Sequence, residues 1–146
     1  ERKALYGDDP LHRLSASAYT PKARTAIYER IIQRAHTILK TGHSVVIDAT
    51  FLNPTDRQQA TAVAANTDIG LYRYWLDAPL ETLIERVTAR RGDASDADAD
   101  GVRKQYESGG QPEDWTHISA VGSIAETVAL IDTDLADKSD APQRHD

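Results

Sequence analysis

Residues 44–48 (SVVID) form a short apolar run in which polar and apolar residues do not alternate. A strand with this pattern needs cover on both faces, which is typical of a parallel sheet flanked by helices. Two further segments, 70–77 (GLYRYWLD) and 115–120 (WTHISA), are predicted to be strands. Helical periodicity occurs around them, over residues 21–39, 54–64, 80–91, 95–107 and 124–135. This alternation predicts an α/β protein with a parallel sheet, whose right-handed crossovers place helices on both faces.

The helix boundaries carry local signals. Thr20 can cap the first long helix, and Gly42 lies just past its end. Ser123 and Glu126 have the spacing of a capping box at the start of the last helix. Because caps satisfy backbone groups that a helix leaves open, these residues predict where the two helices begin and where the first one ends.

The composition disfavours several kinds of site. The 146 residues include no cysteine, so disulfides and thiolate metal sites are excluded and a reducing, cytoplasmic location is expected. The formal charge of −6 disfavours a broad nucleic-acid surface, and no apolar run reaches the roughly 18 residues of a membrane span. The five histidines show no metal-ligand spacing. We therefore expect no nucleic-acid partner and no membrane.

Asp48 ends the first of the three predicted strands. In open parallel sheets ligands bind at the carboxyl ends of strands, so its carboxylate is expected to face that crevice. An apolar strand that ends in an acid is also the form of a Walker B strand, whose Asp holds Mg²⁺ beside nucleotide phosphates. An ordinary helix cap or turn former is the alternative. Thr50 would point to the same side and could bond a phosphate, the metal's water or Asp48, with a local turn bond as its alternative.

Five stretches together resemble the P-loop kinase-like ATP-binding domains of the AAA-33 and zeta-toxin-like family: ERKALYG, YTPKARTAIYERI, GHSVVIDATFLNPTDR, LDAPLETLIERVTARRGDASDAD and, more weakly, WTHISAVGS. The resemblance covers nearly the whole chain. It implies a three-layer α/β/α P-loop NTPase fold of the nucleoside-kinase type over residues 1–137, with a lid-like region at 85–107 and a flexible tail at 138–146. It also implies ATP and Mg²⁺ as cofactors. In some bacterial proteins such a domain follows an aminoglycoside-phosphotransferase-like domain.

The sequence contains no phosphate-cradling G-x-x-x-x-G-K-[ST] loop, since KTGHS at 40–44 has the wrong order and spacing. In the family, the strand before that loop lies between the strands that match 44–48 and 71–76. Without it, each buried unpaired amide would cost roughly 1–3 kcal/mol. The chain also lacks methionine and begins at Glu1. We therefore expect the distal part of a larger unit, in which an upstream segment or domain completes the sheet; an exposed strand edge could also pair with a second copy as a homo-oligomer.

Three arginines toward a helix end form a second candidate cluster. Arg86 and Arg90 share one helix face, whereas Arg91 is turned by about 100°. By the resemblance they belong to the lid, where Arg86 and Arg90 would be catalytic and would neutralise charge on the transferring phosphoryl group. Arg91, like Thr50, would bind the nucleotide. The alternative is that cations near a helix C-terminus complement its dipole.

Arg2 and Arg57 are the candidates for binding the acceptor substrate. Arg57 lies one turn into the helix that follows Asp48, and an ordinary surface position is its alternative. Arg2 belongs to ERKALYG, a stretch that in the family follows a substrate-facing acid, and that acid is not present here.

Three functions remain open. The leading one is ATP-dependent phosphoryl transfer to a hydroxyl of a small molecule, in which Asp48 organises Mg²⁺ or acts as the base. VVIDAT also resembles the D-x-D-x-T motif of haloacid-dehalogenase-type phosphatases, but Thr50 stands where the second Asp belongs. The third is a non-catalytic kinase-like module that binds a partner or regulates a neighbouring domain. The acceptor is open among sugars, aminoglycosides, nucleosides, peptidoglycan precursors and polynucleotide ends.

Overall fold

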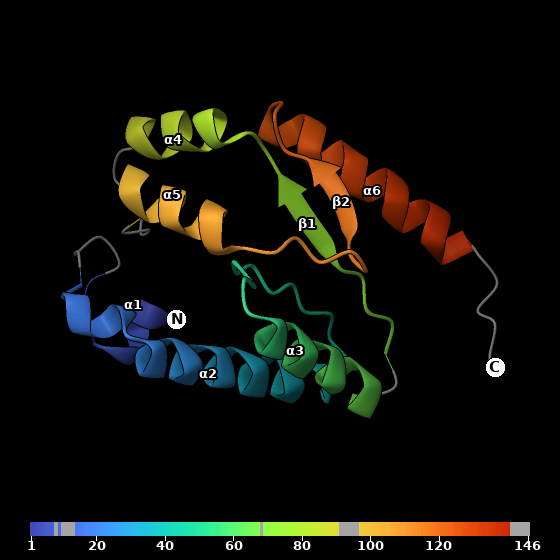
Figure 1. Ribbon diagram of the computed structural model, residues 1–146. Coiled ribbons are helices and arrows are strands. Elements are labelled where there is room, and N and C mark those ends of the chain that lie inside the picture. The colour runs from blue at the N-terminus through green and yellow to red at the C-terminus, as the bar shows by residue number, and fades with distance from the viewer. Residues whose placement is uncertain (8, 10–13, 68, 91–96, 141–146) are drawn as a thin grey trace.

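A computed structural model describes residues 1–7, 9, 14–67, 69–90 and 97–140 (Figure 1). In chain order the elements are α1 (Arg2–Leu5), the 3₁₀ helix η1 (Ala16–Tyr19), α2 (Pro21–Leu39), α3 (Pro54–Thr67), β1 (Tyr74–Asp77), α4 (Leu80–Ala89), α5 (Ala99–Ser108), β2 (Thr116–Ser119) and α6 (Ile124–Asp140). The α/β class is confirmed in this coarse form, as helices around a small parallel sheet. None of the described helices is both long and apolar enough to cross a bilayer.

The predicted caps of α2 and α6 are confirmed. The Thr20 hydroxyl accepts a hydrogen bond from the backbone of the first turn of α2, and Gly42 closes that helix with a φ of 80°, which suits a residue without a side chain. At the start of α6, the Glu126 carboxylate accepts from the backbone N–H and the hydroxyl of Ser123 at 2.7 and 2.8 Å. The Ser123 hydroxyl oxygen in turn accepts from the Glu126 N–H at 3.2 Å, which completes the capping box.

Several helix boundaries differ from the prediction: α3 ends at Thr67, α4 ends at Ala89, and α5 and α6 differ by more. Helix α5 begins at Ala99, because the Asp98 carboxylate caps it by accepting from the Gly101 N–H at 2.9 Å. Helix α6 runs through Asp140, so residues 138–140, which were assigned to the tail, are helical. Residues 141–146 lie outside the described part of the chain.

Strands β1 and β2 form a parallel pair in which Tyr74 is opposite Thr116 and Asp77 is opposite Ser119. Helix α6 lies alongside β2 and α4 beside α5, whereas α1, α2 and α3 lie together on the other side of the molecule (Figure 1). Side chains fasten α6 to both strands: the Tyr74 hydroxyl donates to Asp134 at 2.7 Å, and the Lys138 ammonium donates to the Thr116 hydroxyl at 2.7 Å. The parallel arrangement of the second and third predicted strands is therefore confirmed.

The predicted strand at 44–48 is wrong for this structure. The chain from 43 to 52 belongs to no helix or strand, and no strand is paired with it among the described residues. Val46 is 94% exposed rather than covered, while Val45 and Ile47 are half-buried. The physical reason is that apolar content favours burial, but a strand also needs a hydrogen-bonding neighbour beside it.

The core is small and lies mainly around α2. The buried apolar residues in the described ranges are Leu14, Ala18, Ala23, Ile27, Tyr28, Ala35, Phe51, Ala64, Ala78 and Ile118. The Phe51 ring contacts Tyr28 and Trp115 edge-on, with 5.5 Å between ring centroids in each pair. Arg24 and Asp56, 2.7 Å apart, join α2 to α3 through an ion pair in which the Asp56 side chain is buried and that of Arg24 is 34% exposed. These contacts join α2 to α3 and link α2, through Phe51, to Trp115 just before β2.

Candidate functional site

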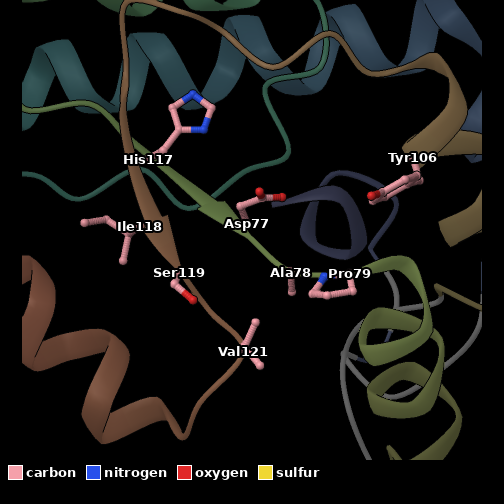
Figure 2. Close-up of a pocket in the computed structure, with 8 residues that line it drawn as sticks. All are labelled: Asp77, Ala78, Pro79, Tyr106, His117, Ile118, Ser119 and Val121. Atoms are coloured by element: carbon pink, nitrogen blue, oxygen red, sulfur yellow. The ribbon is translucent and has the colours of Figure 1, made fainter.

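A hollow opens where β1 and β2 end, and we call it the edge hollow (Figure 2). It has a volume of about 380 Å³ and is lined by Asp77, Ala78, Pro79, Tyr106, His117, Ile118, Ser119 and Val121. Asp77 and Ser119 are register partners at the last position of the two strands. Because the strands are parallel, their carboxyl ends meet at one edge, which is where ligands bind in open α/β sheets. The volume is in the range of small-molecule sites.

Asp77 supplies the carboxylate of the edge hollow. Its side chain is half-buried and points toward the side where Tyr106 lies (Figure 2). Its Oδ1 accepts a hydrogen bond from the Gln111 amide at 3.2 Å, and its backbone oxygen accepts from the Ala120 N–H at 2.7 Å. Asp77 therefore joins the loop before β2 to the loop after it, at the mouth of the edge hollow.

The loop of residues 120–122, between β2 and α6, is hydrogen-bonded to β1 and to α4 and is followed by the capping box of α6. From β1, the Asp77 carbonyl holds the Ala120 N–H. From α4, the Arg86 guanidinium donates to the carbonyl oxygens of all three loop residues. On the α6 side lies Glu126, whose pKa is held below its usual value by hydrogen bonds from the backbone and hydroxyl of Ser123. A Cβ on Gly122 would lie 2.6 Å from Oε2 of Glu126, so a side chain at this position would push the Glu126 carboxylate away from its place in the capping box.

Asp48 lies away from these contacts. Its side chain is exposed, and it makes no hydrogen bond or ion pair within the described residues. It lines neither the edge hollow nor a second hollow beside α3. The structure therefore does not bring Asp48 together with Arg86.

The turn after Asp48 is fixed by Tyr28. The Tyr28 oxygen accepts from the Phe51 N–H at 3.0 Å and is 3.3 Å from the Thr50 hydroxyl oxygen. Phe51 has a φ of 44°, which a non-glycine residue adopts only under constraint. The Arg57 guanidinium donates to the carbonyl oxygens of Phe51 at 2.6 Å and Leu52 at 3.2 Å. Thr50 and Arg57 thus both take part in shaping this turn.

The candidate arginines occupy different places. Arg86 is bonded to the 120–122 loop, and Arg90 follows the last residue of α4 with an exposed side chain. Arg91 lies outside the described residues. Arg2 donates to the Ala18 carbonyl and places its guanidinium carbon 4.8 Å from the centroid of the Tyr19 ring. Arg86 and Arg90 were predicted to act together, but Arg86 is bonded to the backbone of the 120–122 loop and Arg90 lies at the end of α4.

Arg57 lines the second hollow, of about 480 Å³, on the flank of α3. Arg73, Asp114 and Trp115 form its other wall, just before β1 and β2 begin. Arg73 and Asp114 are paired at 2.8 Å. The two hollows therefore lie at opposite ends of the strand pair.

Sequence reasoning missed the residues of the edge hollow as a site. Asp77 ends the predicted strand at 70–77 in the same way that Asp48 ends the one predicted at 44–48. That shared position was a signal that could have drawn attention to it. Tyr106, Gln111 and Ser119 gave no such signal, because they come together only through the pairing of β1 with β2 and the packing of α4 with α5.

Comparisons with known proteins bear on this geometry. Residues 1–111 match the AAA-33 family, which is described as an AAA domain. An uncharacterized protein of Mycobacterium bovis and two of Mycobacterium tuberculosis are each 31% identical to this chain over 87 residues. That match spans 60% of this chain and 18% of each relative, less than a fifth of their length. No solved structure matches the chain.

Proposed function

Because the chain belongs to the AAA-33 family of P-loop kinase-like AAA domains, we propose that it is part of an ATP-dependent kinase that phosphorylates a hydroxyl of a small molecule. The family match over residues 1–111 carries this proposal. The edge hollow supports it, because it lies at the carboxyl ends of parallel strands, where nucleotides bind in α/β folds.

The proposed architecture is the three-layer α/β/α fold of P-loop kinases. A segment outside these 146 residues would add a strand between residues 44–48 and β1. Two features favour this completion: the backbone of 44–48 pairs with no strand among the described residues, and the Val46 side chain is exposed, whereas a completed three-layer sheet would pair that backbone and cover both faces. The same open edges are the basis for the alternative of pairing with a second copy.

The described residues fit a nucleotide and Mg²⁺ in part. Mg²⁺ keeps several waters and takes one or two protein carboxylates, and the exposed carboxylate of Asp48 suits that requirement. No cluster of three or more His, Asp or Glu side chains exists in the described ranges, so a metal site made wholly of side chains is not proposed. The 146 residues contain no phosphate-cradling loop, which the added segment would have to supply.

Bound MgATP would supply the phosphoryl group and screen its charge. Asp48 is proposed to hold the ion or to accept the proton of the attacking hydroxyl. Arg90 and Arg91 are proposed to balance charge on the phosphates, with Thr50 as a further polar contact. Arg2 and Arg57 stay the proposed acceptor-binding residues.

Calorimetric titration of the full-length protein with ATP, with and without Mg²⁺, tests nucleotide binding. We expect one nucleotide per chain, bound more tightly with Mg²⁺, and a loss of about tenfold in the Mg²⁺-dependent affinity in Asp48→Asn. Glu29→Gln, on the exposed side of α2, is the matched control and should bind as the wild type does. If the wild type binds no nucleotide, the proposal fails. ADP formation with a panel of sugars, aminoglycosides and nucleosides would then identify the acceptor.

A non-catalytic nucleotide-binding module is the second candidate. One observation favours it: Arg86, a candidate catalytic residue, is already bonded to three carbonyl oxygens. ATP binding without ADP formation from any acceptor in the panel would support this candidate over the kinase.

A further inference from the structure

Arg86 makes an unusual set of contacts for an exposed arginine. Its Nη2 donates to the carbonyl oxygens of Val121 and Gly122, both at 2.8 Å, and its Nη1 donates to the carbonyl oxygen of Ala120. Three successive carbonyl groups thus point at one guanidinium that lies 34 to 36 residues earlier in the chain. A planar fork with several donors can satisfy all three oxygens, whereas the single ammonium of a lysine cannot match the geometry.

The hydrogen bonds from Arg86 to the carbonyl oxygens of residues 120–122, which we call the clamp, hold residues that form part of the edge hollow or contact its lining. Val121 lines the hollow and Ala120 is bonded to the backbone of Asp77, which lines it from the other strand. If the three carbonyl oxygens lost the Arg86 guanidinium, they would turn toward water, and the wall that Val121 forms would shift. Within the described residues Arg86 has no carboxylate partner, so the carbonyl groups are its bonding partners there.

The lining of the edge hollow indicates which part of a nucleotide suits it. Among the described residues, Asp77 is the one carboxylate of the lining, and none of them that lines the hollow is a lysine or an arginine. A carboxylate repels phosphates but accepts hydrogen bonds from hydroxyl or amino groups. The flat or apolar surfaces of Tyr106, Pro79 and Val121 suit a ring. The hollow therefore suits the uncharged, nucleoside end of a nucleotide better than its phosphates.

We propose that Arg86 is a positioning residue that fixes the 120–122 loop and thereby shapes the edge hollow for a nucleoside. In this role it does not contact the transferred phosphoryl group, in contrast to the charge-neutralising role that the sequence pattern suggested. The ligand in this statement rests on the proposed function, whereas the clamp on the loop does not.

The test measures how tightly the full-length protein binds each end of the nucleotide, the nucleoside and the phosphates, in separate titrations. Adenosine and inorganic tripolyphosphate are titrated separately into the wild type, Arg86→Gln, Arg86→Lys and the control Arg34→Gln, which changes an exposed arginine of α2. We expect Arg86→Gln to weaken adenosine binding by about tenfold and tripolyphosphate binding by less than about twofold. Arg86→Lys should restore part of the adenosine affinity, because it keeps the charge and one donor group. A loss of tripolyphosphate affinity equal to or larger than that of adenosine would overturn the proposal.

Hydrogen exchange of the backbone amides tests, without any ligand, whether Arg86 holds the 120–122 loop. In Arg86→Gln, amides in peptides covering residues 119–124 should exchange about tenfold faster than in the wild type, with no change in Arg34→Gln. If exchange in this loop is unchanged, the inference that Arg86 holds the loop is wrong. If the wild type binds neither adenosine nor ATP, the proposed function fails, and the exchange result still decides whether Arg86 holds the loop.

Discussion

Replacing Tyr28 with phenylalanine tests how the turn after Asp48 is held. The substitution removes one oxygen from a nearly buried side chain and leaves the ring contact with Phe51 in place. It deprives the Phe51 N–H of its acceptor, at a buried position, and frees the more exposed Thr50 hydroxyl to bond water. The loss therefore falls on the backbone N–H of a residue with a positive φ, while the hydrogen bonds from Arg57 to the carbonyl oxygens of Phe51 and Leu52 remain.

The expected loss of stability in Tyr28→Phe follows from the buried N–H of Phe51. A buried donor without a partner costs about 1–3 kcal/mol, and the exposed Thr50 bond adds little. With an m value of about 2 kcal/mol/M in urea, a loss of about 2 kcal/mol shifts the unfolding midpoint by about 1 M. Tryptophan fluorescence can follow the transition, because Trp115 contacts Phe51.

The matched control is Tyr6→Phe, which removes the hydroxyl of an exposed tyrosine. This substitution should change the free energy of unfolding by no more than about 0.5 kcal/mol. If Tyr28→Phe changes stability no more than Tyr6→Phe does, the reasoning about the turn is refuted.

Three further predictions concern caps and pairs. Gly122→Ala should lower Tm by about 2–4 °C, because the new methyl group displaces Glu126 from the capping box, whereas Gly110→Ala, with open space around it, should have almost no effect. The pKa of Glu126 is lowered from 4.5, so the ionised carboxylate stabilises the folded state above that pH, and this stabilisation is lost as the pH falls below it. The difference in Tm between the wild type and Glu126→Gln should therefore shrink toward about pH 3. A Tm difference that stays constant with pH would contradict this prediction. Arg24→Ala should destabilise by about 2 kcal/mol in urea unfolding, because it leaves the Asp56 carboxylate nearly buried and unpaired, and Asp56→Asn in the same background should recover part of that loss.

Features set by neighbouring residues could be predicted from the sequence. Thr20 and the Ser123–Glu126 pair act within one helical turn, so their spacing alone predicts their bonds. The parallel pair β1–β2 was also predictable, because a helical segment separates two apolar runs and a parallel connection requires such a crossover.

Features set by distant partners could not be predicted. Residues 44–48 have the composition of a strand, but strand formation depends on a neighbour, and none is paired with them in the described part of the chain. The spacing of Arg86 and Arg90 predicted one shared role, yet Arg86 bonds a loop more than thirty residues away. Helical spacing says which side chains share a face, and it does not say what lies opposite that face.

The central claim is that the edge hollow holds the nucleoside end of a nucleotide, and photolabelling tests it most directly. The full-length protein is irradiated with an ATP analogue that carries a photoreactive group on adenine, and the labelled peptides are mapped by mass spectrometry. The account predicts labelling in peptides that contain Tyr106 or residues 119–121, and protection by excess ATP. Labelling confined to other peptides, such as those of the second hollow along α3, or labelling that ATP does not suppress, would contradict it.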